Sequence, residues 1–217
     1  MTYPSCNLYN IGILLFCLML CACNTHSTSQ ETAAVTDTTI LPVPRQENGN
    51  SFYMLDKSPM DIIYFPPEYP KLKMMGKATQ GPVFRVMYSR PQKNGREIFG
   101  TVVKYGEHWR LGANEATEIE FFKDVIIQQK KIHKGRYVLY CIPQPTEWTL
   151  ILNSDLYSWG LKIDDQKDIF KFTVPASHVT GTIEAFTMET EETGDGALLW
   201  IGWDDTKVSL PIQLPAK

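Results

Sequence analysis

Residues 118–153 read EIEFFKDVIIQQKKIHKGRYVLYCIPQPTEWTLILN, and this stretch decides the fold class. Its first four residues alternate polar and apolar side chains, as a strand with one buried face does. Three further apolar runs follow, separated by polar or glycine-containing segments that are typical of turns. The predicted strands are residues 118–121, 125–127, 137–142 and 148–153, with residues 128–136 as a connection.

The same period-two pattern extends to both sides of this stretch, and no long amphipathic helix is evident. Residues 58–72 contain four prolines, which limit them to an irregular or edge segment around a short strand at 62–65. Turn residues stand at 194–196 and at 204–205. The remaining predicted strands are residues 82–88, 169–174, 183–189, 198–203 and 207–214. About nine short strands predict an all-β fold, an antiparallel β-sandwich or barrel-like single domain.

The strand at 198–203 is apolar on both of its faces. Leu199, Ile201 and Trp203 lie on one face, and Leu198 and Trp200 on the other. A central strand that is covered on both sides explains this pattern. The alternative is an exposed aromatic platform for a partner or a glycan.

The N-terminal segment has the pattern of an export signal. Residues 11–20 form an apolar run that is too short to span a bilayer core but suits the hydrophobic region of a signal peptide. Leu20-Cys21-Ala22-Cys23 then resembles a lipobox, in which the sulfur of the last cysteine receives the lipid. The alternatives are an uncleaved anchor helix or an ordinary signal peptide, and either would still export the domain.

These patterns predict three parts: a lipoprotein signal peptide at 1–22, lipidated Cys23 with a disordered tether at 23–50, and a β domain at 51–217. The tether is rich in Thr, Ser, Pro and Asn, and it lacks the apolar side chains that would offset its ordering entropy. Two or more acyl chains, palmitate among them, give stable anchoring. Asn24 follows the cysteine where an inner-membrane retention signal would have Asp. We therefore expect a location in the cell envelope, at the outer membrane facing the periplasm.

Charge and cysteine content exclude several classes of protein. The net charge is −3, and no basic cluster predicts nucleic-acid binding. Cys141 is the only cysteine of the predicted domain, so no disulfide can form within it. Paired Cys or His spacings for a metal are absent. The sequence predicts no cofactor and no metal site.

Five blocks of the sequence resemble the bacterial "domain of unknown function 2911" family. They are YSRPQKNGREIFG at 88–100, YGEHWRLGANEATEIEF at 105–121, KGRYVLYCIP at 134–143, EWTLILN at 147–153 and WDDTKVSLPI at 203–212. The lead-in SPMDIIYFPPEYPKLK at 58–73 is similar to that of lipoprotein members of the Bacteroidetes type. Those relatives commonly have an Asn-Gly hairpin turn where this chain has Gln128-Gln129, which implies a looser or differently closed hairpin. The resemblance implies the fold and the lipoprotein context, but no activity.

The densest polar cluster surrounds the motif WRLGANE. Guanidinium groups there would recognise a carboxylate or phosphate, and an indole would stack on a sugar or ring. The alternative is structural: a tight turn at 112–114, an ion pair between Arg110 and Glu115, and Asn114 bonded to its own backbone. The candidate ligand-binding residues are Arg90, His108, Trp109, Arg110, Asn114 and Glu115.

The leading functional hypothesis is a non-enzymatic, lipid-anchored β domain that binds a glycan, a small ligand or an envelope protein through residues 109–115. No residue set has the pattern of a catalytic site, which favours binding over catalysis. The first alternative is an envelope hydrolase of glycans or peptides with Glu115 or His108 as general acid or base. The second alternative is an architectural envelope component.

Overall fold

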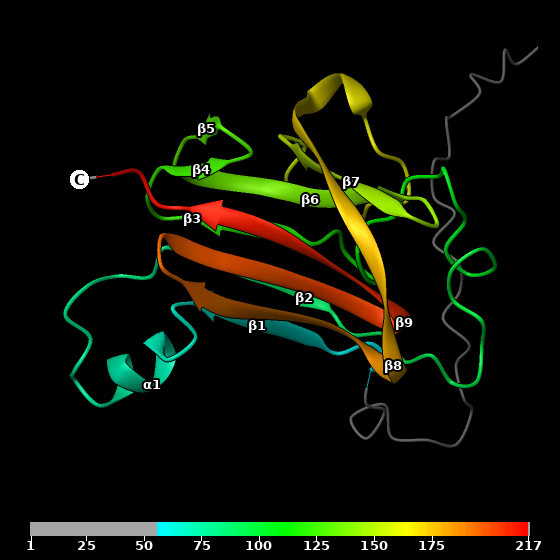
Figure 1. Cartoon of the computed structure of the whole chain (residues 1–217), viewed down its shortest axis with the longest axis horizontal. Helices are drawn as coiled ribbons and strands as arrows, with labels where there is room; N and C mark the ends of the chain where they lie inside the picture. The colour runs from blue at the N-terminus through cyan, green and yellow to red at the C-terminus, as the bar shows by residue number, and fades with distance from the viewer. Residues whose placement is uncertain (1–55, 217) are drawn as a thin grey trace, which may run out of the picture. The chain divides into compact units, whose positions relative to one another are not determined.

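The computed structural model describes residues 56–216, and these fold into an antiparallel β structure (Figure 1). Its nine strands follow the order β1-β2-β3-β6-β7-β8-β9-β4-β5. They are β1 (Met60–Phe65), β2 (Phe84–Ser89), β3 (Glu118–Phe121), β4 (Val125–Ile127), β5 (Lys130–Ile132), β6 (Gly135–Pro143), β7 (Glu147–Asn153), β8 (Asp168–Thr193) and β9 (Gly196–Gln213). The predicted all-β class is therefore confirmed. The predicted signal peptide, Cys23 and the tether lie outside the described residues.

The sheet curls because β8 takes part in two pairings. Its first part pairs with β7, from Asp168 to Pro175, and its second part pairs with β9. The ladder with β9 shifts register on both sides of Ile183, as a bulged strand does where it bends. The far end of β8 reaches β1, where the Thr190 hydroxyl donates to the carbonyl oxygen of Tyr64 at 2.9 Å. Figure 1 shows β8 crossing from β7 towards β1.

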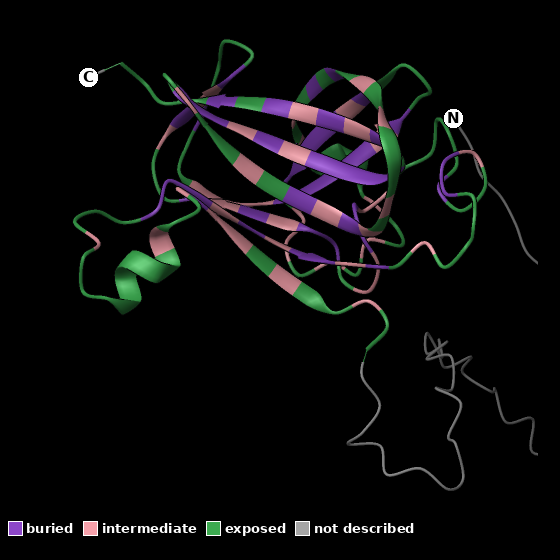
Figure 2. Ribbon diagram, turned by 60° about the horizontal axis from the view of Figure 1, so that its bottom comes forward, coloured by how far each residue is buried: buried purple, intermediate pink, exposed green. Residues whose placement is uncertain are grey.

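Alternating side chains fill the space inside this curled sheet. Phe84, Val86 and Tyr88 of β2 are buried, as the alternation in the sequence predicts. Buried positions alternate with exposed or half-buried ones along most strands (Figure 2). The main core cluster contains side chains from all nine strands, and a smaller second cluster contains Ala116, Val138, Tyr140 and Ile151.

One pair of predicted strands is a single long strand in the structure, because segments 169–174 and 183–189 both belong to β8. Segments 198–203 and 207–214 both belong to β9, but the chain reverses between them at the predicted turn, with Asp204 at φ +55°. After this reversal, a Cβ on Gly202 would lie 3.6 Å from that of Lys207, and a Cβ on Gly196 would lie 2.1 Å from the carbonyl oxygen of Ile212. The two halves of β9 therefore lie side by side as a hairpin, and the predicted turn at 204–205 is confirmed.

Two further elements were not predicted. Residues 69–74 of the proline-rich lead-in form the short helix α1 (Tyr69–Met74), which starts with a proline in its first turn. The segment 128–136 contains β5, which pairs with β4. No helix among residues 56–216 is long and apolar enough to cross a membrane.

The β4–β5 hairpin is closed tightly, so the expectation of a looser or differently closed hairpin is wrong. Ile127 pairs with Lys130, so Gln128 and Gln129 form a two-residue turn, with φ values of +46° and +63°. Two positive φ values are typical of the type I′ turn that Asn-Gly usually makes. Gln128 adopts this conformation while its side-chain amide donates to the carbonyl oxygen of Thr173 at 2.7 Å.

We expect Gln129→Gly to raise the free energy of unfolding by about 0.5–1 kcal/mol, because glycine adopts positive φ without the steric cost of a Cβ. Gln128→Gly is the matched control, since it relieves the same strain but removes the bond to Thr173. Urea unfolding of the two variants measures both effects. A loss of stability in Gln129→Gly would show that this turn is not strained.

Candidate ligand-binding groove

Trp109 packs inside the protein among four other aromatic side chains. Its ring centroid lies 5.0 Å from that of Phe186 and 5.8–5.9 Å from those of Phe99, Trp148 and Trp203. Its indole N–H donates to the carbonyl oxygen of Gly112 at 3.3 Å. Trp109 is therefore a partly buried side chain that packs against the hydrophobic core.

Arg90 connects β2 to β1 and β8. Its guanidinium donates to Asp61 Oδ2 at 3.2 Å, to the carbonyl oxygen of Phe186 at 3.2 Å and to Thr187 Oγ1 at 2.9 Å. All three nitrogens thus have partners within the protein. Arg90 and Trp109 both contact Phe186. The Phe186 carbonyl oxygen accepts a hydrogen bond from Arg90, and the Phe186 ring packs against Trp109.

The turn at 112–114 is held by neighbouring segments. Buried Ser89 accepts a hydrogen bond from the Ala113 N–H at 2.6 Å, and it also donates to the Ala113 carbonyl oxygen. A Cβ on Gly112 would lie 2.8 Å from Ser89 Oγ, so only glycine fits. Asn114, at φ +57°, donates to Asp56 Oδ2 at 2.8 Å and to the Ser58 carbonyl oxygen at 3.2 Å, and not to its own backbone.

No hydrogen bond or ion pair joins the side chains of the other three predicted residues in the described part of the chain. The stem of Arg110 packs on Gly160, and burial lowers the pKa of its guanidinium. Its buried Nε has no hydrogen-bond partner among the described residues. Glu115 is exposed, and no ion pair between these two side chains occurs in the described part of the chain. His108 lies edge-on to Tyr140, with centroids 5.3 Å apart.

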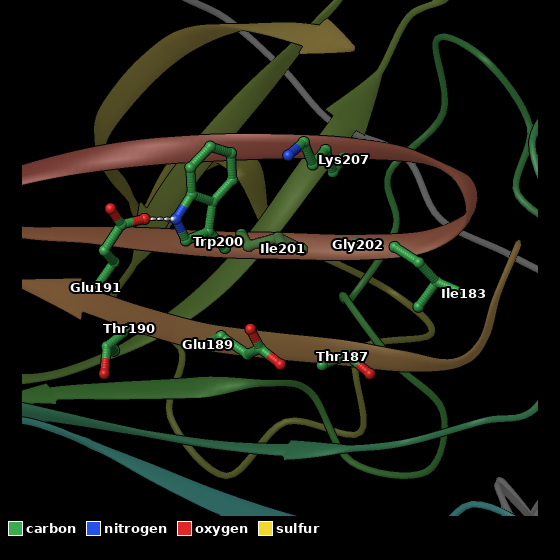
Figure 3. Close-up of a pocket in the computed structure, with 9 residues that line it drawn as sticks. All are labelled: Ile183, Thr187, Glu189, Thr190, Glu191, Trp200, Ile201, Gly202 and Lys207. Carbon is green, nitrogen blue, oxygen red and sulfur yellow. Dashed lines mark hydrogen bonds between the residues drawn. The ribbon is translucent and has the colours of Figure 1, made fainter. Parts of the chain in front are cut away.

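A groove of about 650 Å³ lies on the outer face of the β8–β9 hairpin (Figure 3). None of the six predicted residues lines it. The two strands are polar towards the groove and apolar towards the core, where Phe186 and Met188 of β8 are buried. The lining residues are Ile183, Thr187, Glu189, Thr190, Glu191, Trp200, Ile201, Gly202 and Lys207.

Strand pairing places the main polar side chains around Trp200. Glu189 lies directly across the ladder from Trp200 and Thr187 from Gly202, so these residues share one face of the hairpin. The indole N–H of Trp200 donates to Glu191 Oε2 at 2.8 Å, as Figure 3 shows. The ammonium of Lys207 lies 4.5 Å from the centroid of the Trp200 ring. These two contacts fix the orientation of a half-exposed indole.

The turn of β9 at Asp204 shapes the groove. It reverses the chain so that Lys207 lies beside Gly202. A Cβ on Gly202 would lie 3.6 Å from the Cβ of Lys207 and 2.7 Å from Ile183 Cδ1. Asp204 is fixed by an ion pair with Lys93 at 2.6 Å and by the Ile98 N–H at 3.3 Å. The groove therefore depends on the buried Asp204 carboxylate and on Gly202, whose lack of a side chain leaves room for Ile183.

This arrangement offers binding groups rather than an activated nucleophile. An indole provides an apolar face and two carboxylates accept hydrogen bonds. The hydroxyls of Thr187 and Thr190 already donate to the carbonyl oxygens of Ala185 and Tyr64. Glu189 makes no ion pair with any described residue, so its oxygens are available to a ligand. Residues 56–216 contain no group of three or more His, Cys, Asp or Glu side chains that could hold a metal ion. Burial raises the pKa of the Cys141 thiol, which makes it a poor nucleophile.

A second pocket, of about 620 Å³, lies where α1 and the following loop approach the β8–β9 turn and residues 214–216. Its polar side chains come from several separate segments of the chain. They include Lys77, Lys123, Glu192 and Asp195. No tryptophan lines it. The β8–β9 groove is the stronger candidate, because its polar side chains are fixed on two paired strands around one aromatic ring.

Sequence patterns indicated one member of the groove. The apolar pair Leu198 and Trp200, on the face of β9 opposite its core side chains, predicted either a covered strand or an aromatic platform. The core side of this strand is buried, whereas Trp200 is only half-buried and lines the groove. Thr187, Glu189 and Glu191 occupy alternate positions of a strand, as polar residues on any solvated face do, so no signal in the sequence distinguished them.

One family model, described as "Protein of unknown function (DUF2911)", matches residues 70–212. The match includes all of β2 to β8, every lining residue of the groove and most of β9. No curated protein and no solved structure is similar to the chain.

Proposed function

Since the chain belongs to the DUF2911 family of proteins of unknown function, we propose from its own side chains that it is a lipid-anchored envelope protein whose β8–β9 groove binds a saccharide. The observation that carries this proposal is the position of Trp200 between Glu189, Glu191 and Lys207 on one strand face. A sugar has an apolar face that packs on an indole and hydroxyl groups that bond to carboxylates.

The charges of the groove narrow the class of saccharide. Two carboxylates, Glu189 and Glu191, face one ammonium, that of Lys207. An acidic sugar would be repelled by the excess negative charge. We therefore infer that the ligand is neutral or carries an amino group. Its ring would displace the Lys207 ammonium from the indole, at a cost of about 0.5–1 kcal/mol for an exposed cation–π contact.

Binding should depend on the indole. We expect Trp200→Ala to weaken binding of a neutral or N-acetylated oligosaccharide by at least about tenfold, which corresponds to about 1.4 kcal/mol. Isothermal titration calorimetry against a panel of such oligosaccharides measures this difference. Trp159→Ala, which removes an exposed tryptophan on a different loop, is the matched control and should bind as the wild type does. Absence of binding by the wild type, or equal binding by Trp200→Ala, would contradict the proposal.

The envelope location rests on Cys23. The lipobox pattern Leu20-Cys21-Ala22-Cys23 supports lipidation, and the 32 residues that separate Cys23 from residue 56 are long enough to let the domain stand off the membrane. We expect expressed protein to incorporate labelled palmitate and Cys23→Ser to incorporate none. Cys21→Ser keeps the attachment residue and should still be labelled. Labelling that is absent from the wild type, or unchanged in Cys23→Ser, would contradict lipidation at Cys23.

A further inference from the structure

The loop between β7 and the short 3-10 helix η2 (Asp165–Lys167) exposes three large apolar side chains. They are Tyr157, Trp159 and Leu161, whose exposed fractions are 83%, 53% and 72%. Single exposed apolar residues are ordinary on a soluble domain. Three at alternate positions of one loop, including a tryptophan and a tyrosine, are typical of a surface that contacts something else.

Contacts with the neighbouring loop hold this segment in one conformation. The Ala116 N–H donates to the Ser158 carbonyl oxygen at 3.0 Å, and the Tyr157 N–H donates to Glu118 Oε1 at 3.2 Å. Gly160, at φ +76°, lies so close to Arg110 that a Cβ would come within 2.8 Å of its stem. The loop is thus fixed in place while its apolar side chains point away from the core.

Tyr157 itself is held in a strained conformation. Its φ is +64°, which is unusual for a bulky residue, and its ring lies 5.9 Å from the Arg136 guanidinium. Arg136 is in turn paired with Glu118 at 3.6 Å. Strain of this kind persists only where the surroundings fix it, and it is concentrated at functional sites. A rigid aromatic loop binds without the entropy loss of ordering a flexible one.

The exposed loop lies at the end of the domain from which the predicted tether leaves. The Asn114 side chain donates hydrogen bonds to Asp56 and Ser58, at the start of the described chain, and the Ala116 N–H donates to the Ser158 carbonyl oxygen. Asn114 and Ala116 are two residues apart, so the start of the domain and the aromatic loop are attached to the same short segment. The described chain therefore starts at a segment that is also bonded to the aromatic loop.

Charge around the loop is nearly balanced. Residues 154–167 contain Asp155, Asp164 and Asp165 against Lys162 and Lys167, a net charge of −1. Such a segment is not attracted to an anionic surface, so its association would depend on burial of apolar area. Tryptophan and tyrosine favour the boundary between lipid headgroups and acyl chains, where the ring is buried and its polar edge stays hydrated.

We propose that the exposed loop inserts Tyr157, Trp159 and Leu161 into the surface of the bilayer that holds the lipidated Cys23. This inference rests on the proposed anchor. The lipid keeps the domain at the membrane, and the loop sets its orientation there, with the 110–118 segment towards the bilayer. The β8–β9 groove lies on different strands, so saccharide binding does not depend on this contact.

Fluorescence quenching of the full lipidated protein tests the insertion. The protein is reconstituted into phosphatidylethanolamine–phosphatidylglycerol vesicles whose acyl chains are brominated, and its tryptophan emission is compared with that in unbrominated vesicles. Trp109, Trp148 and Trp203 are enclosed in the core or packed against it, so they contribute little to the quenching. We expect quenching of the wild type, loss of most of this quenching in Trp159→Phe, and retention in Trp200→Phe, which removes one tryptophan from the groove instead.

Two results would overturn the insertion. One is a wild-type emission that bromination does not change, which is also the result expected if the loop is covered by a protein partner or by a second copy of the chain. The other is equal quenching of the wild type and Trp159→Phe. Palmitate labelling of the same preparation separates these results from failure of the anchor, because a labelled protein without quenching contradicts the insertion alone. Quenching should be the same at low and high salt, since the loop carries little net charge.

Discussion

We expect Trp109→Ala to lower the free energy of unfolding by about 3–5 kcal/mol, the range for removal of a large aromatic side chain, because this ring packs against the core. Four aromatic rings have their centroids within 6 Å of the Trp109 ring, and they would line the resulting cavity. Aromatic pairs of this geometry add about 0.5–1.5 kcal/mol beyond the buried area. Urea unfolding followed by circular dichroism measures the loss.

The control for Trp109→Ala is the same substitution at Trp159, which is half-exposed and should change stability by less than about 1 kcal/mol. A Trp109→Ala protein that keeps wild-type stability but loses ligand binding would show that this indole belongs to a binding site. It would also restore the 109–115 segment as the leading candidate.

Gly196→Ala should be comparably destabilising, by about 3 kcal/mol or more. A Cβ at this position would lie 2.1 Å from the carbonyl oxygen of Ile212 and 2.9 Å from Gln213 Cα, and these are backbone atoms. No side-chain rotation relieves such a contact. The first residue of β9 would therefore have to separate from the last residues of the same strand, near the single bridge between Ile126 and Gln213.

Gly194→Ala is the matched control, because it adds the same methyl group two residues earlier in the same turn. A Cβ there has no neighbour within 4 Å. We expect this variant to be as stable as the wild type, or slightly more stable. Thermal unfolding of both proteins provides the comparison. Similar melting temperatures for the two variants would mean that the strand end can move aside at little cost.

The sequence predicted the strands well where apolar residues alternate within one segment, as in 118–121 and 148–153. The turn at 204–205 was predicted as well, and it is stabilised by Lys93 and Ile98 from a distant loop. The prediction failed at β8, because nothing local shows that segments 169–174 and 183–189 are one strand. The two parts of β8 pair with different partners.

The candidate site was harder to predict than the fold. A cluster of Arg, His, Trp, Asn and Glu has the same composition whether its side chains converge on a cavity or hold a loop in place. Trp109 packs inward and Asn114 connects two segments, and neither role can be read from residue type. The groove combines side chains from two strands, and only Trp200 departed from an ordinary solvated pattern.

A nuclear magnetic resonance titration tests the central claim most directly. The five tryptophans give separate indole N–H signals, and three of them report on different surfaces: Trp200 on the groove, Trp109 on the 109–115 segment and Trp159 on the exposed loop. On addition of an oligosaccharide that binds, the largest shift should occur at the Trp200 indole, whose N–H bonds to Glu191. A shift centred on Trp109 and the amides of residues 108–115, with Trp200 unchanged, would contradict the account.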